Sequence, residues 1–170
     1  MTSLYSLTGR NGKFVHQELD ADGVATGDMT IVTRTTQWAV SPTLATSSEW
    51  GDSESAGYTN RASGRKDGTF TAEGKYDTGE DRGQTQDVNE IYDLFQPGDY
   101  ASAVLWLDGS ASPVLASLYW DFPRALCNDF GLTVNIDSEE VIGWTSSWGA
   151  DGIFYYPGQA GATVRAMPTL

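Results

Sequence analysis

Runs of alternating apolar and polar residues recur along the chain, and each run is typical of a strand with one buried face. The clearest lies at 65–77, where Phe70, Ala72, Gly74 and Tyr76 alternate with polar residues. A segment rich in β-branched residues follows the same logic at 29–40. Further strands are expected at 13–17, 100–107, 113–122, 131–136, 141–148 and 153–156. The pattern predicts about eight strands.

One segment has the spacing of a helix instead. In residues 87–95, Val88, Ile91 and Leu94 recur on one helical face, and a Pro-Gly pair follows at 97–98. Such a face packs against an apolar surface, and Pro-Gly ends a helix. These elements predict a single mainly β domain over 1–170, a β-sandwich or small barrel with one flanking α-helix.

Two other segments carry no periodicity. Residues 41–63 are polar and small, which predicts a long loop, and loops of this length are commonly functional. Trp50 and Tyr58 within it are costly to leave in water, so we expect them to contact another subunit. Residues 158–170 are small and polar, and we expect an extended C-terminal tail.

The charge balance narrows the classes of partner. The 170 residues carry 23 acidic and 10 basic side chains, a formal net charge of −13. Because affinity for phosphate depends on Lys and Arg, this balance argues against nucleic-acid binding and against docking on an anionic membrane. It fits plain solubility or a surface that repels nearby DNA. The beginning of the chain does not resemble a signal peptide, and no apolar run approaches the ~20 residues of a membrane span, so we expect synthesis in a cytosol.

Candidate chemistry is sparse. His16 and Cys127 are the only residues of their types, and they lie far apart in sequence. No nucleophile-and-base set can be assembled, no phosphate-binding glycine loop is present, and the Asp-rich run at 20–23 lacks the Glu of a calcium loop. We therefore predict no catalytic, cofactor-binding or metal-binding residues, and a protein that is not an enzyme. Six tryptophans could line a sugar-binding surface, which keeps a carbohydrate-binding module as an alternative.

A resemblance comes from the order of the segments. A strand ending at 38–41 leads through the long polar segment into a strand with the pattern Gly-x-x-Asp-Gly-Thr at its start, at 64–69. The segments that carry the likeness are 38–41, 61–77, 97–99, 132–144 and 152–157. Together they resemble the tail-tube proteins of long-tailed bacteriophages. The insertion at 20–28 and the aromatic run at 118–122 are not features that the family requires.

The resemblance implies a β-sandwich that assembles into stacked hexameric rings as the major tail-tube subunit of a virion. Such a protein is made in the bacterial host cytoplasm, binds other tail proteins and lets DNA pass through an acidic channel without specific binding. The long segment carrying Trp50 and Tyr58 would stack the rings. The channel candidates are Glu73, Asp77, Asp137, Glu139 and Glu140. A capsid decoration or cement protein of the same fold is the alternative.

Overall fold

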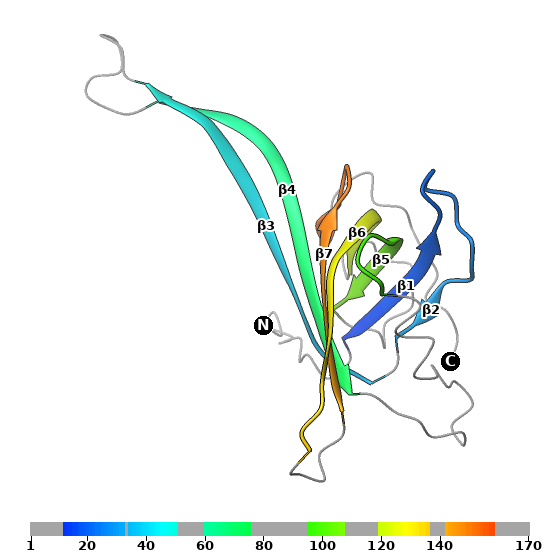
Figure 1. Cartoon of the computed structure of the whole chain (residues 1–170). Helices are drawn as coiled ribbons and strands as arrows, with labels where there is room; N and C mark the ends of the chain where they lie inside the picture. Colours follow the sequence, from blue (N-terminus) through cyan, green and yellow to red (C-terminus); the bar gives the residue numbers. More distant parts are fainter. Residues whose placement is uncertain are drawn as a thin grey trace, which may run out of the picture.

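The computed structural model describes residues 12–32, 34–50, 60–75, 95–107, 119–136 and 142–158, without the side chains of 45–50 and 60–65. They form one antiparallel sheet of seven strands (Figure 1). The strands are β1 (Lys13–Leu19), β2 (Thr30–Ile31), β3 (Thr35–Trp50), β4 (Asn60–Lys75), β5 (Tyr100–Trp106), β6 (Tyr119–Thr133) and β7 (Gly143–Ala150). Their order across the sheet is β2-β1-β5-β6-β7-β4-β3. The mainly β class is confirmed.

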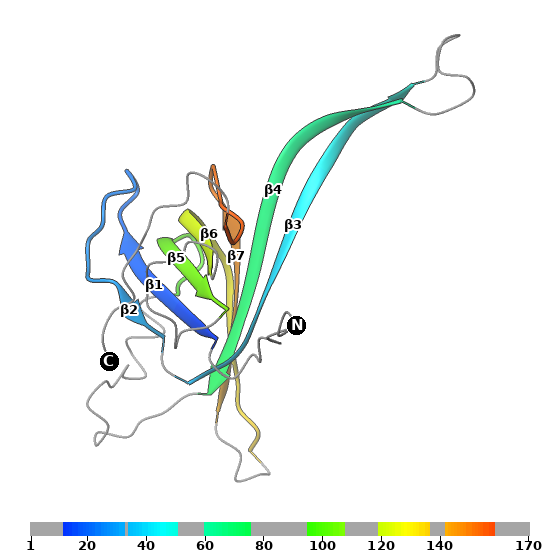
Figure 2. The ribbon, with the colours of Figure 1, turned by 180° about the vertical axis from the view of Figure 1, so that it is seen from behind.

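The sheet curves strongly enough that its two halves share one core (Figure 2). Phe14 of β1 and Phe70 of β4 belong to strands separated by three others, yet their ring centroids lie 5.9 Å apart. His16 of β1 lies equally close to Trp148 of β7, at 5.9 Å. The predicted β-sandwich or small barrel of about eight strands is not confirmed in this detail, because the described residues form one curved sheet of seven strands. Alternation shows which face of a strand is buried but not which strands pair.

The buried face follows the sequence pattern closely along β4. Phe70, Ala72 and Gly74 are buried, whereas Thr71 and Glu73 between them are exposed. This confirms the alternation expected for that strand. β5 differs, because nearly all of its residues are buried, as expected of a strand with apolar groups on both faces.

Phe95 is the one residue of the predicted helix 87–95 that lies in the described part of the chain. Its side chain is fully buried, and its ring contacts those of Phe14, Trp144 and Trp148 at 5.4–5.9 Å. The rest of the helix, and the tail at 158–170 beyond Gly158, lie outside the described residues and stay predictions.

Two strand predictions have different boundaries in the structure. The expected strand at 29–40 is interrupted at Arg34, whose φ of 57° ends pairing with β1 and starts a new strand. The expected strands at 113–122 and 131–136 contribute to a single strand, β6, which continues through a bulge. A bulge inserts an extra residue without ending the pairing between strands. Polar residues at a bulge therefore give the same sequence pattern as a turn.

The expected strand at 153–156 does not form a hairpin with β7. Instead Tyr155 bridges Asp121 of β6, with N–O distances of 2.8 and 3.1 Å between their backbones. The bridge places Phe154 on the core, where it stacks on Phe122 with ring centroids 5.5 Å apart.

The predicted loop at 41–63 is wrong over 41–50 and 60–63, which belong to β3 and β4. β4 pairs with β7 only over 69–75, so residues 42–50 and 60–68 pair with each other alone and protrude from the body (Figure 1). We call these residues the hairpin arm. At ~3.3 Å per residue the arm extends roughly 30 Å. Gly68 at the base of the arm lies against Phe154, and beyond it backbone hydrogen bonds pair the two strands of the arm.

Close packing against Gly74 gives a stability prediction. A Cβ at this position would lie 2.6 Å from the Arg34 carbonyl oxygen and 2.6 Å from the Trp144 ring. Because neither the backbone nor a buried indole can move freely, Gly74→Ala should lower the free energy of unfolding by about 1–3 kcal/mol in urea titrations. Gly27→Ala is the matched control, since no atom lies within 4 Å of its Cβ. Equal stability of both variants would contradict this account.

Candidate assembly and channel surfaces

The outer face of strands β3, β4, β7 and β6 carries small and polar side chains. The register aligns them in two rows across the four strands. One row is Gln37, Glu73, Thr145 and Gly131, and the other is Ala39, Thr71, Ser147 and Asp129. We call these eight residues the polar sheet face. It lies on the side of these strands opposite to Phe70, Ala72 and the rest of the core.

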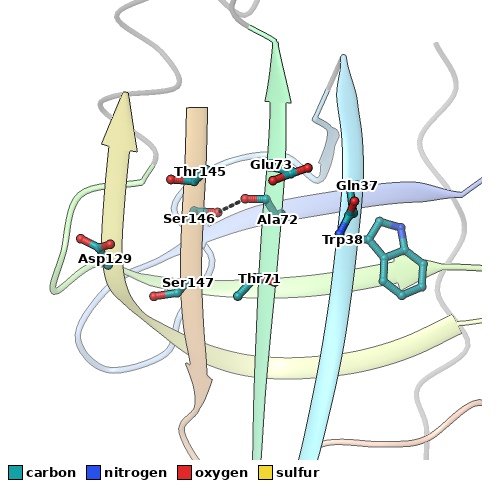
Figure 3. A pocket seen from close by; sticks show the side chains of 9 residues that line it. All are labelled: Gln37, Trp38, Thr71, Ala72, Glu73, Asp129, Thr145, Ser146 and Ser147. Carbon is teal, nitrogen blue, oxygen red and sulfur yellow. Dashed lines mark hydrogen bonds between the residues drawn. The ribbon is translucent and has the colours of Figure 1, made fainter. Parts of the chain in front are cut away.

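A groove of about 280 Å³ lies along this face (Figure 3). Two carboxylates, those of Glu73 and Asp129, line it, and neither Lys nor Arg is among its lining residues. Lys75 is exposed two residues beyond Glu73 in the same strand. The groove therefore presents hydroxyl groups and negative charge to water.

The floor of the groove is bonded to the core. Ser146 Oγ donates to the Ala72 carbonyl oxygen at 3.4 Å (Figure 3) and accepts a hydrogen bond from Trp148 Nε1 at 3.0 Å. Since Trp148 is fully buried, this pair of bonds satisfies its polar atom and ties β7 to β4. The polar sheet face consequently rests on a rigid support.

The structure places only some of the predicted site residues. Glu73 lies on the polar sheet face, and its role in a channel stays a prediction. The backbone of Trp50 ends β3 in the hairpin arm, opposite Asn60. The remaining candidates lie outside the described residues: Tyr58, Asp77, Asp137, Glu139 and Glu140.

Asp129 belongs to the polar sheet face but was not predicted from the sequence. It sits just after the β6 bulge between Cys127 and Asp129 and pairs with Ser147. The sequence pattern placed it between two strands, in an expected connection. Its turn-like neighbours gave no signal that distinguishes an acid in a bulge from an acid in a loop.

The two side chains with potential catalytic chemistry belong to the core. His16 is buried with its ring edge-on to those of Phe14, Phe95 and Trp148, and burial lowers its pKa to about 4. Burial raises the pKa of the Cys127 thiol to about 11, and its Sγ donates to the Phe95 carbonyl oxygen at 3.3 Å. A thiol that stays protonated at neutral pH is a poor nucleophile.

The described ranges contain no group of three or more His, Cys, Asp or Glu side chains that could hold a metal ion. They contain no helix that is long and apolar enough to cross a membrane.

The tryptophans bear on the carbohydrate-binding alternative. Trp106, Trp144 and Trp148 are buried, and Trp38 and Trp120 are partly buried against the core. A sugar-binding platform needs exposed aromatic faces, whereas the described tryptophan side chains pack inward. Packing in the core therefore explains the tryptophan content that suggested a carbohydrate-binding module.

Comparison with known proteins places the fold. No family model and no curated protein matches the sequence. Among solved structures, the chain is similar to a subunit of the tail of an empty GTA particle with C6 symmetry (TM-score 0.62, 10% identity, 89% of this chain and 98% of that chain). It is also similar to the SPP1 tail tube (TM-score 0.60, 16% identity, 91% and 80%). The chain has the tail-tube fold.

A third similar structure is the baseplate of the anti-feeding prophage (TM-score 0.59, 12% identity, 91% of this chain and 99% of that chain). The resemblance read from the sequence is thus confirmed at the level of the fold. In this tail-tube fold the polar sheet face and the hairpin arm are joined through β3 and β4, which contribute to both.

The buried histidine gives a pH prediction. The pKa of His16 is lowered in the folded state, so unfolded chains bind its proton more readily. The free energy of unfolding is therefore highest above the ordinary pKa of 6.5, where His16 is neutral in both states. It decreases as the pH falls from 6.5 towards 4. The loss should be on the order of 3 kcal/mol. Urea unfolding at pH 7 and pH 4.5 should show a smaller pH effect in His16→Gln than in the wild type. Equal pH effects in the two proteins would refute this role.

Proposed function

We propose that the chain is a virion structural protein, the major subunit of a tail tube that forms stacked hexameric rings. The observation that carries this proposal is the fold match, which extends over about nine-tenths of this chain to subunits of assembled tails. One of those tails has C6 symmetry, which supports a ring of six. The subunit is non-catalytic, resides in the virion tail and assembles in the host cytoplasm with other tail proteins.

The polar sheet face is the surface that we assign to the channel. DNA moving through a tube needs a wall without basic groups or large apolar side chains, because both would retard it. Glu73 and Asp129 supply repulsion, and hydroxyl groups of Thr71, Thr145 and Ser147 keep the wall hydrated. The chain's net charge of −13 is consistent with this use.

Further channel acids follow from where the strands end. Lys75 of β4 and Thr133 of β6 both align with Gly143, so β4 and β6 end at the same edge of the polar sheet face. The segments that continue from them include Asp77, Asp137, Glu139 and Glu140. We assign these carboxylates to one mouth of the channel.

The hairpin arm is the element that we assign to ring stacking. Within the described ranges its two strands pair only with each other, so the outer edge of each strand is available to a second chain. Its reach of roughly 30 Å carries it beyond the body of its own subunit. Trp50 at the end of β3 and Tyr58 in the segment between β3 and β4 are the proposed contact residues.

Removal of the arm tests the stacking role. Replacing residues 44–66 by Asn-Gly retains the Thr43–Asp67 pair and supplies a two-residue hairpin turn. The variant should keep the wild-type melting temperature within a few degrees, because the arm lies outside the core, yet form no tubes. Negative-stain electron microscopy and sedimentation measure the outcome. Tubes of normal length would show that the arm does not stack rings, and small trimers would favour a decoration protein.

Charge reversal tests the channel assignment. Glu73→Lys with Asp129→Lys should leave tube assembly intact but slow genome delivery several-fold, because DNA phosphates would be attracted to the wall. The effect should shrink as salt screens the charges. Asp22→Lys with Asp28→Lys makes the same charge change at exposed positions in the β1–β2 connection and should deliver DNA at the wild-type rate. Equal delivery by both double variants would exclude the polar sheet face as the channel wall.

A further inference from the structure

The end of β6 carries an exposed apolar group that the fold does not use. Leu132, Val134 and Ile136 are 44%, 59% and 91% exposed. They are spaced two apart across the point where β6 ends, at its last paired residue Thr133. Scattered apolar residues are normal on a surface, but three together at a protruding end indicate a contact surface. We call these three residues the β6 apolar end.

The β6 apolar end and the hairpin arm lie at opposite ends of the molecule (Figure 1). The pairing register requires this arrangement. Thr133 pairs with Gly143 at one end of β7, while Thr69 pairs with Gly149 at the other, and the arm continues beyond Thr69. A chain with a protruding element at each end can form a head-to-tail contact, in which two different surfaces meet.

The base of the arm offers a matching surface. Leu44 is 50% exposed in β3 and pairs with Lys66. It lies three residues beyond Ser41, which aligns with the last pair of the body, so it stands ~10 Å past that edge. Residues 134–136 follow the end of β6 and reach at most ~10 Å from the other edge. Two stacked copies whose sheet edges lie up to about 20 Å apart would bring these apolar groups to the same height, and an arm of roughly 30 Å spans that gap.

From this geometry we infer that the β6 apolar end docks on the base of the hairpin arm, around Leu44, of a second copy of this chain in the adjacent ring. The inference rests on the proposed tube function and adds the receiving surface that a stacking arm requires. Burial of Val134 and Ile136 against Leu44 removes apolar area from water and leaves the polar sheet face free for the channel. The contact is heterologous, so each copy both inserts an arm and receives one.

A matched pair of valine variants tests the inference. Val134→Asp puts a charge into the β6 apolar end, whereas Val24→Asp makes the same change at a valine of nearly equal exposure, 61% against 59%, in the β1–β2 connection. Val134→Asp should raise the critical concentration for tube formation at least about tenfold, as expected from exclusion of one aliphatic group from a contact. Val24→Asp should assemble at the wild-type concentration. Sedimentation and electron microscopy report assembly, and thermal unfolding confirms that both variants fold.

Cross-linking identifies the partner surface directly. Leu44→Cys combined with Ile136→Cys should yield, on oxidation, a ladder of linked chains on a non-reducing gel, while either change alone stops at dimers. Cys127 does not interfere, because its thiol is buried. If tubes form without a ladder, or if Val134→Asp assembles like the wild type, the inference is wrong while the tube function stands. If the wild type forms neither rings nor tubes, the proposed function itself fails.

Discussion

The structure depends on one constraint: a single sheet has to bury its own concave face. In the described part of the chain the two ends of the sheet approach each other across a layer of aromatic rings, and Phe95 lies at the centre of that layer. Its ring contacts Phe14 on one side and Trp144 and Trp148 on the other. Aromatic side chains suit this purpose because each fills a large volume and buries 150–250 Å². The curvature of the sheet is therefore inseparable from its aromatic content.

The same packing explains where small and polar residues are found inside. A Cβ at Gly68 would lie 2.8 Å from the Phe154 ring, so glycine is the residue that allows this ring to reach the core. Ser146 is buried because it serves Trp148 Nε1 and the Ala72 carbonyl oxygen together. His16 has aromatic neighbours on three sides, and its neutral form is favoured for that reason.

Curvature also divides the molecule into surfaces with separate uses. Since the concave face is occupied by the core, the opposite face of β3, β4, β7 and β6 is left to water and carries hydroxyl and carboxylate groups. β3 and β4 are each 16 residues long, whereas the adjacent β7 has 8 residues, so the part of β3 and β4 beyond β7 forms an arm. A subunit with the arm at one end and the β6 apolar end at the other has a direction, and the proposed stacking would propagate that direction along a filament.

The sequence by itself determined the strands whose burial is one-sided. The alternation of Phe70 and Ala72 with Thr71 and Glu73 predicted both the strand and its water-facing acid, because a pleated strand exposes every second side chain. Tertiary structure decided the rest. Residues 42–50 became strand only by pairing with β4, Asp129 joined the polar sheet face through a bulge, and the sheet closed on itself through contacts between β1 and β4. These outcomes depend on residues that are distant in sequence. The local alternation of apolar and polar residues does not determine which distant strand supplies the hydrogen bonds.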